Sequence, residues 1–420
     1  MRVLIYGINF FPELTGIGKY TGEMAAWLAA HGHQVRVLTA PPYYPQWHVA
    51  EGYVNWWRRE HDIHSSGIDH GGPGSLIVYR CPLWVPAKVT GLKRLVHLAS
   101  FSLSSVPILI KQLFWRPDVV WVVAPAFFCA PGAWLMARLC GAKCWLHIQD
   151  FEVDAAFDLG LLKAQHLRRC ATAIEGWLLR RFDVVSTISN RMLERAVAKG
   201  VAQAHTVLFP NWADISAVSP DGNKEAFRAE LGIDNDTVVA LYSGNMGAKQ
   251  GLEILAQAAA LLQGNAKLAF VFCGNGVGRA ELVTRCTGLL NVHFLDLQPL
   301  EKLGTLLATA DIHLLPQRAD AADLVMPSKL TGILASGRPV VATAHEGTGV
   351  AKVVAGCGVV VPPEDPDAFA NAIASLAAKP VERARLGRAA RAYAEKNLAR
   401  DTVLDVFEQQ LTALKEGKRS

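Results

Sequence analysis

The sequence predicts an α/β protein with two doubly wound, Rossmann-like domains facing each other across a cleft. Three observations lead to this class. Short apolar runs alternate with helical segments, the alternation restarts after a polar stretch at 216–224, and several runs end in glycine. Parallel strands that are covered on both faces have such continuous apolar runs, and open parallel sheets bind ligands at the carboxyl ends of their strands.

The length bounds the number of domains. With 420 residues the chain is long enough for two or three domains that each bury a core. We place the first domain at 1–215 and the second at 216–395. We expect a C-terminal helix at 396–420, which can pack back on the first domain.

The composition is typical of a globular enzyme, with 51% hydrophobic and 19% charged residues. The net charge of +5 is too weak to indicate a nucleic-acid binder, and it suits an anionic small molecule or an acidic membrane surface. The eight cysteines form no C-x-x-C pair, so we expect neither zinc nor disulfides. The first apolar run ends in a Pro/Gly loop without a signal cleavage site, which predicts the first strand of a cytoplasmic protein.

In the first domain we expect strands at 3–6, 35–38, 76–80, 119–123, 144–148, 184–188 and 207–209, with the clearest helix at 166–181. The first strand is followed by a loop and by a helix that runs to Ala30. Gly16 and Gly18 stand at the start of this helix, where missing side chains would let a phosphate or a sugar approach the backbone. A flexible turn before a helix explains the same pattern equally well.

The segment 41–86 is rich in proline, glycine and tryptophan, and only 76–80 within it has a strand pattern. Trp47, Trp57 and Arg58 lie in this segment. Their ring faces and positive charge suit the binding of sugar rings or of a membrane surface. The histidines at 48, 61, 64 and 70 lack the regular spacing of metal ligands, so we expect no metal site there.

A basic, amphipathic stretch follows at 88–116. Its charge-free part, 95–110, has 16 residues and is too short and too polar to span a membrane. We favour a packed helix pair of the first domain. The alternative is a helix that lies on an anionic membrane, with basic residues at the lipid head groups, namely Lys88, Lys93, Arg94, Lys111 and Arg116.

The expected strand at 144–148 is followed by Gln149 and Asp150, and it carries His147 near its end. A histidine and a carboxylate at the carboxyl end of a parallel strand are catalytic candidates more often than packing residues. We therefore predict catalytic roles for Asp150 and His147.

The second domain repeats the pattern, with strands expected at 238–242, 268–272, 292–295, 312–315, 340–342 and 359–361 and three helical pieces after 366. Helix starts near Asn245, Gly276 and Ser328 can bind an anion, because free backbone N–H groups and the helix dipole favour negative charge. Ser328 can cap a helix at 328–335. Lys249 and Lys329 add full positive charges beside these starts.

The second domain has candidate anion sites, and the first domain has the candidate catalytic carboxylate of Asp150. Together they indicate an enzyme that transfers a group away from a diphosphate. The chain has no Walker motif, which argues against an ATPase. A nicotinamide dehydrogenase is disfavoured as well, because the first glycine loop lacks a third glycine and no acidic residue follows it at the required distance.

The chain resembles a known family, the retaining nucleotide-sugar glycosyltransferases of family 4, over nearly its whole length. The resemblance rests on GIG at 16–18, LFPNWAD at 208–214, YSGNMGAKQGLE at 242–253, FCGNG at 272–276, ADIHLLPQ at 310–317, PSKLTGILASGRPVV at 327–341 and GCGVVVPPEDPDAFANAI at 356–373. FFPE, YYPQW, GNMGAKQGLE and HIQDFEVDAAFDLG look like the subgroup that builds exopolysaccharide repeats, similar to the colanic-acid fucosyltransferase.

The resemblance implies the GT-B architecture, a GDP-sugar donor with GDP-fucose favoured, and a lipid-diphosphate-linked saccharide as acceptor. It also implies a peripheral place on the inner face of the cytoplasmic membrane. The reaction would be a displacement on one face of the sugar, in which the leaving phosphate takes the acceptor's proton and no metal or other cofactor is required. A sugar-nucleotide epimerase, which needs no acceptor, and a non-catalytic scaffold, which binds without turnover, remain alternatives.

The candidate residues fall into three sets. The donor set is Gly16, Gly18, Asn245, Lys249, Gln250, Gly274, Asn275, Gly276, Ser328 and Lys329. The catalytic set is Asp150, His147 and Lys329, and the acceptor set is Trp47, Trp57 and Arg58. The family's paired glutamates fall on Leu324 and Gly332, so Asp320 or Asp323 is the candidate to replace the second one, which holds the ribose. Lys352 stands where the family often has Glu.

Overall fold

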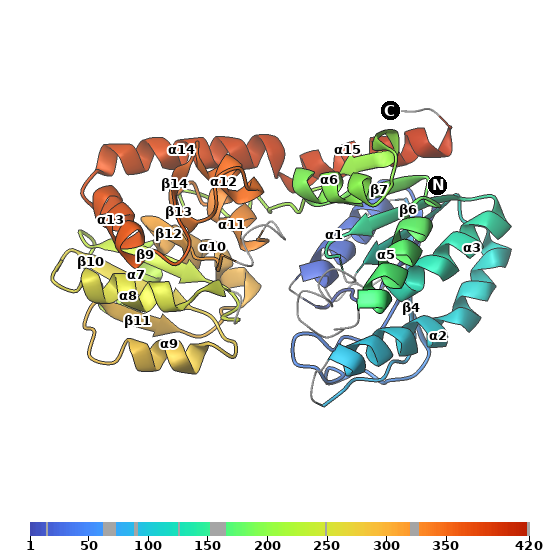
Figure 1. Cartoon of the computed structure of the whole chain (residues 1–420), viewed down its shortest axis with the longest axis horizontal. Coiled ribbons are helices and arrows are strands. Elements are labelled where there is room, and N and C mark those ends of the chain that lie inside the picture. Colours follow the sequence, from blue (N-terminus) through green and yellow to red (C-terminus); the bar gives the residue numbers. More distant parts are fainter. Residues whose placement is uncertain are drawn as a thin grey trace. The chain divides into compact units, whose positions relative to one another are not determined.

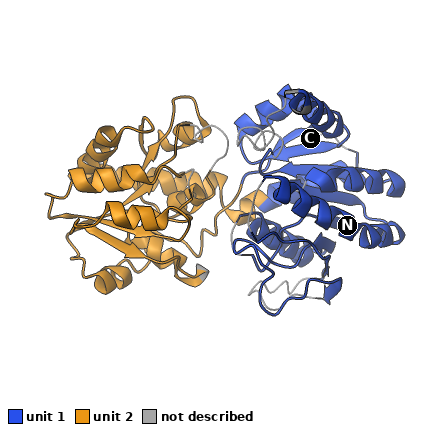
Figure 2. Cartoon of the chain, turned by 60° about the horizontal axis from the view of Figure 1, so that its bottom comes forward, with its two compact units in different colours: residues 1–210, 404–420 blue, residues 211–403 orange. Residues whose placement is uncertain are grey.

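The computed structural model describes residues 1–13, 16–61, 73–87, 91–124, 127–151, 165–247, 250–319 and 327–417. The chain divides into two compact units, shown in different colours in Figure 2. Unit 1 comprises residues 1–210 and 404–420, and unit 2 comprises residues 211–403. Each unit contains one sheet with helices packed on it (Figure 1), which confirms the predicted α/β class with two doubly wound sheets.

The sheet of unit 1 has eight strands in the order β3-β4-β2-β1-β5-β6-β7-β8. The strands are β1 Arg2–Tyr6, β2 Gln34–Thr39, β3 Arg58–His61, β4 Ser75–Arg80, β5 Val119–Ala124, β6 Lys143–Ile148, β7 Val184–Thr187 and β8 Thr206–Leu208. All neighbouring strands pair in parallel except β3, which is antiparallel to β4. The prediction that 41–86 holds only one strand is therefore wrong. The edge strand β3 was missed because its four residues, RREH, show no apolar alternation.

The helices of unit 1 are α1 Gly16–Ala30, α2 Gly91–Trp115, α3 Ala130–Cys140, α5 Gln165–Leu179 and α6 Asn190–Ala198, with short turns η2 Phe127–Cys129 and η3 Gln203–His205. The last helix, α15 Arg400–Lys415, begins at the end of unit 2 and belongs to unit 1 from residue 404 on. Residues of α2, α3 and α5 share one apolar core with the face of the sheet that carries Tyr6. Part of the core of unit 1 comes from α15, where the ring of Phe407 lies 5.2 Å from that of Trp145 and 4.6 Å from that of Phe209. The end of the chain therefore belongs to unit 1.

One helix, α2, replaces the helix pair that we favoured, so that prediction is wrong. It runs for 25 residues with Pro107 inside it. The proline is tolerated because it lies on the exposed side, where water can bond the freed carbonyl. By length and composition α2 is, within the described part of the chain, the helix that could cross a membrane, and 33% of its apolar window is buried in the fold. The prediction that this stretch is too short and too polar to span a membrane was therefore too strict.

The sheet of unit 2 has six strands in the order β11-β10-β9-β12-β13-β14, all parallel. The strands are β9 Val238–Ser243, β10 Leu268–Cys273, β11 Val292–Leu295, β12 Ile312–Leu315, β13 Val340–Thr343 and β14 Gly358–Val361. The helices are α7 Glu225–Leu231, α8 Glu253–Leu261, α9 Arg279–Arg285, α10 Leu300–Thr309, α11 Lys329–Ala335, α12 Gly349–Val354, α13 Pro366–Ala377 and α14 Pro380–Asn397. Each predicted strand of this unit is confirmed within one residue at each end, because continuous apolar runs mark the doubly covered strands.

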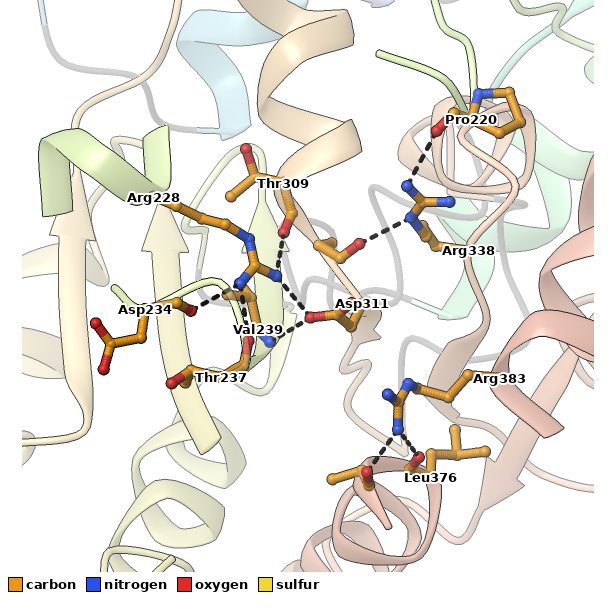
Figure 3. A network of polar contacts seen from close by, with 12 residues as sticks. Pro220, Arg228, Asp234, Thr237, Val239, Thr309, Asp311, Arg338, Leu376 and Arg383 are labelled. Carbon is orange, nitrogen blue, oxygen red and sulfur yellow. Dashed lines mark hydrogen bonds and ion pairs between the residues drawn. The ribbon is translucent and has the colours of Figure 1, made fainter. Parts of the chain in front are cut away.

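A buried arginine ties the first helix of unit 2 to its sheet (Figure 3). The side chain of Arg228 is 3% exposed and donates to the carbonyl oxygens of Asp234, Thr237 and Thr309 and, at 2.7 Å, to the carboxylate of Asp311. The same carboxylate accepts from the backbone N–H of Val239 at 2.8 Å. This cation therefore satisfies carbonyls that would otherwise be left without a donor.

We expect Arg228→Met to lower the free energy of unfolding by about 3 kcal/mol, because it leaves the partner carboxylate without its cation. The matched control is Arg285→Met, whose ion pair with Glu281 is exposed on both sides and, screened by water, should contribute little to stability. Guanidinium unfolding of the two variants provides the comparison. Equal losses in the two variants would contradict the structural role of Arg228.

Candidate active site

Lys329 lies where the carboxyl end of β9 meets α11. Its ammonium donates to the hydroxyl of Tyr242 at 3.0 Å and to Oε1 of Gln250 at 2.9 Å, and it lies 4.2 Å from the centre of the Tyr242 ring. Burial lowers the pKa of Lys329 to about 7. Both hydrogen-bond partners are neutral, so the ammonium is largely stripped of water without a compensating charge from either of them. An anion placed beside it would restore that compensation.

Two glycine loops meet next to Lys329. Gly244 follows β9 and Gly274 follows β10, and a side chain at Gly274 would place its Cβ 1.9 Å from the carbonyl oxygen of Gly244. The N–H of Met246 donates to the carbonyl oxygen of Asn275 at 2.9 Å, which holds the loops together. Because β9 lies between β10 and β12 in the sheet, these loops stand at the point where the strand order reverses. Such a point is the usual ligand site of an open parallel sheet.

Several residues of the predicted donor set are brought together there. A Cβ at Gly244 would lie 3.7 Å from Cε of Lys329, and one at Gly276 would lie 2.8 Å from Oδ1 of Asn245. Asn245, Asn275 and Gly276 are exposed, and Gln250 bonds Lys329. Tyr242 was not predicted as a site residue, because its sequence pattern is that of an ordinary strand residue. Its place directly before the glycine loop, at the carboxyl end of a strand, is the signal that could have identified it.

The predicted cap at Ser328 is wrong. Ser328 already has helical dihedral angles, φ −58° and ψ −28°, and its side chain makes no capping hydrogen bond. The helix α11 has seven residues, so its dipole is small. The positive charge at this place is therefore that of Lys329. Lys249, Asp320, Asp323 and Leu324 lie outside the described residues.

Gly332 takes the position of one family glutamate, but it stands within α11 against α10. A Cβ at Gly332 would lie 3.2 Å from Cδ1 of Leu307, a buried residue of the unit 2 core. A glutamate there would have to pass this leucine to reach a ligand. The structure therefore gives a packing reason for the small residue.

In unit 1, Gly18 makes room for a buried carboxylate that the sequence analysis did not single out. A Cβ at Gly18 would lie 2.6 Å from Cβ of Glu13, whereas a Cβ at Gly16 would meet no atom within 4 Å. Glu13 is 4% exposed and accepts from the N–H groups of Tyr43 and Tyr44 at 3.0 and 3.1 Å. Burial raises the pKa of Glu13 despite these bonds. Residue 18 is therefore a glycine because a side chain there would collide with Glu13. Of the two glycines, only Gly16 has free space around its backbone.

His147 and Asp150 stand at the end of β6 in different environments. His147 is 2% exposed, Nδ1–H can donate to Oγ of Ser186 at 2.9 Å, and Nε2 can accept from the amide of Gln149 at 3.1 Å. Burial lowers the pKa of His147 to about 3, so the ring is neutral. Asp150 is partly exposed. Asp150 is thus the more accessible of the two side chains, and the catalytic roles of both stay predictions.

The predicted acceptor residues do not form one cluster in the described contacts. Trp47 is half-buried and its ring lies 5.2 Å from that of His97. The indole N–H of Trp57 donates to the carbonyl oxygen of Ser104 at 2.9 Å, which places this ring on α2. Arg58, on β3, is exposed and lies 3.9 Å from the carboxylate of Glu60. Their acceptor roles stay predictions.

Comparison with known protein families gives a match to each half of the chain. The family described as glycosyl transferase 4-like domain matches residues 15–212, and the family described as glycosyl transferases group 1 matches residues 223–393. The putative colanic acid biosynthesis glycosyl transferase WcaI of Escherichia coli (strain K12) is 44% identical over 97% of this chain and 98% of that protein. The probable glycosyltransferase WbjE of Pseudomonas aeruginosa is 26% identical over 65% of this chain and 69% of that protein.

Solved structures of low identity share the fold over the whole length. Sucrose-phosphate synthase of Thermosynechococcus elongatus matches with a TM-score of 0.75 at 18% identity, covering 100% of both chains. HepE of Anabaena, solved in complex with UDP and glucose, matches with a TM-score of 0.68 at 16% identity, covering 98% of this chain and 100% of that one. At these identities the likeness establishes the fold alone.

Proposed function

This chain belongs to the retaining glycosyltransferases of family 4, and we propose that it transfers fucose from GDP-fucose to a lipid-diphosphate-linked saccharide. The family, the GT-B fold and the similarity to a colanic acid biosynthesis glycosyl transferase support transfer of a sugar from a nucleotide sugar in polysaccharide assembly. The identity of the base, the sugar and the acceptor is our proposal, which follows from the resemblance to the exopolysaccharide subgroup.

The observation that carries the proposal is Lys329 with its neutral partners beside two glycine loops. A bound diphosphate would place negative charge beside this ammonium, whose present partners are both neutral. The exposed backbone of the glycine loops lets phosphate oxygens come close. Asn245 and Gln250 add amide donors to the same place. The glycine loops after β9 and β10, together with Lys329 at the start of α11, thus offer donors and a positive charge suited to a nucleoside diphosphate.

The mechanism in this proposal is a displacement on the face of the sugar that the diphosphate leaves. As the bond from the sugar to the phosphate oxygen breaks, positive charge develops on the ring and negative charge grows on the diphosphate. Lys329 stabilises the growing negative charge, and the carboxylate of Asp150 stabilises the positive one. The acceptor hydroxyl gives its proton to the leaving phosphate oxygen as it bonds the sugar carbon.

Thermal melting in the presence of GDP, UDP, CMP or NAD tests the proposal. Only GDP is expected to raise the melting temperature strongly, because a ligand that binds the native state alone adds about 2.7 kcal/mol at a hundredfold excess over its dissociation constant. A shift by UDP and not GDP would reject the proposed base. No shift by any diphosphate would reject the donor site itself and leave a scaffold role, in which the lost family glutamates remove nucleotide binding.

The affinity for the donor is expected to fall as the pH rises above about 7. Below this pH Lys329 is charged with or without ligand, so the affinity is constant. Above it the free lysine is neutral and the bound one is held protonated by the diphosphate, so binding takes up a proton and weakens by up to about tenfold per pH unit. Calorimetric titration with GDP-fucose, whose diphosphate is fully ionised throughout, measures this slope. The same slope in Lys329→Met would contradict the assignment.

A further inference from the structure

The outward side of α2 is apolar although no other part of the chain that the structure describes packs on it. The side turned to the sheet is buried and includes Leu98, Phe101 and Leu109. The opposite side exposes large apolar side chains, of which Leu103 is 72% and Phe114 is 86% exposed. A surface helix of a globular protein normally carries polar residues on that side. The exposed apolar stripe therefore requires an explanation other than packing within unit 1.

The neighbouring helix α3 continues this surface. The hydroxyl of Ser102 donates to the carbonyl oxygen of Phe128 at 2.8 Å, and a Cβ at Gly132 would lie 3.2 Å from Cδ2 of Leu109, so the two helices pack side by side (Figure 1). We call the exposed apolar residues of this pair the outer face. Its members are Leu92, Val96, Leu103, Val106, Ile110 and Phe114 of α2, Phe128 of η2, and Leu135 and Leu139 of α3.

The charged residues of α2 and α3 are all basic. Neither α2 nor α3 contains an aspartate or a glutamate. Their exposed basic residues are Lys93 and Lys111 on α2 and Arg138 on α3, and Arg116 follows α2 directly. An apolar surface on two helices whose own charged residues are all basic complements the interface of a bilayer that contains anionic lipids. A second copy of the chain is a poorer partner, because in a symmetric dimer these like charges would face one another.

Hydrogen bonds on the inner side of α2 fix how the helix can meet a membrane. His97 donates through Nδ1–H to the carbonyl oxygen of Trp84 at 2.6 Å, Gln112 accepts from Arg36 at 2.9 Å, and Ser105 bonds the hydroxyl of Tyr6. Crossing the membrane would break these bonds and expose buried polar groups to hydrocarbon. The helix can instead lie in the plane of the interface while it stays part of unit 1.

We infer that the outer face is the surface by which this protein binds an anionic lipid bilayer, with α2 and α3 lying along the interface. A lipid-linked acceptor would then be presented at the surface on which the enzyme sits. That use rests on the proposed function, whereas the binding of lipid rests on the outer face alone.

Sedimentation with lipid vesicles tests the inference, using the full chain without nucleotide. We expect the protein to bind vesicles of phosphatidylcholine with phosphatidylglycerol, to bind those of phosphatidylcholine alone much more weakly, and to be released by salt. The double variant Leu103→Gln/Phe114→Gln should lose binding by about tenfold for each side chain. Lys93→Gln/Lys111→Gln should lose about fivefold for each charge on the anionic vesicles only.

Two control variants replace exposed residues of unit 2. Leu290→Gln/Val381→Gln is the control for the apolar pair, and Lys302→Gln is the control for the lysines. Both should bind like the parent protein. Failure of the parent protein to bind anionic vesicles, or an equal loss in the control, would overturn the inference. So would a dimer in sedimentation velocity that Leu103→Gln/Phe114→Gln dissociates, because the partner would then be a second copy. All variants should keep their melting temperature and the shift by GDP, so a missing GDP shift with intact vesicle binding would reject only the proposed function.

Discussion

Replacing Lys329 with alanine is expected to lower the turnover of sugar transfer by about a hundredfold to a thousandfold. The ammonium would stabilise charge that grows on the diphosphate only as the bond to the sugar breaks, so its loss should appear in kcat. Steady-state kinetics with a nucleotide sugar and an acceptor analogue measure the effect. Lys302→Ala, which removes an exposed lysine from α10, is the control and should leave turnover unchanged.

The same substitution should not weaken the fold. Burial holds the pKa of Lys329 at about 7, below the value of an unfolded lysine, so the charged form is less favourable in the folded state. The unfolded protein therefore binds more protons between pH 7 and 10, and this group makes stability rise with pH over that range. Lys329→Ala should abolish that rise and be as stable as the parent protein, or more stable, at pH 7. Unchanged turnover in this variant would reject the catalytic role.

Asp150→Asn is expected to retain the affinity for the nucleotide and to lose about a hundredfold or more in transfer. Asp150 follows β6 in unit 1, whereas the residues that would hold the diphosphate belong to unit 2. The substitution keeps the shape of the side chain and removes only the charge that would oppose the developing positive charge of the sugar. Calorimetry with GDP and turnover measurements separate the two effects.

Asp401→Asn provides the control for Asp150, because it removes an equivalent charge from the exposed start of α15. It should alter neither affinity nor turnover. Loss of GDP binding in Asp150→Asn would contradict the assignment and place the residue among the nucleotide ligands.

Strands that are covered on both faces of a sheet could be predicted from the sequence. The strands β1, β5 and β10 are continuous apolar runs with almost no exposed residue, so their positions follow from local composition. The edge strand β3 has no such run, since one backbone edge is bonded to β4 and its side chains are mostly solvated. Its existence depends on a partner that lies distant in sequence, which no local pattern reports.

The residues around the candidate site show the same division. The motif around Lys329 and the glycine loops was recognisable from sequence, and the family it indicates is confirmed by the matches to both halves of the chain. The contact of Lys329 with Tyr242 joins residues that are 87 positions apart. The assignment of Gly18 to an open loop likewise missed Glu13, whose burial is decided by the chain at Tyr43 and Tyr44.

The α/β class, most strand positions and the enzyme family followed from the sequence, because apolar periodicity and short motifs are properties of neighbouring residues. The tertiary structure alone decided which side of α2 is buried, which carboxylate Gly18 accommodates and how far the pKa of Lys329 falls. Each of these depends on desolvation by segments distant in the chain, and desolvation exists only after the units have packed.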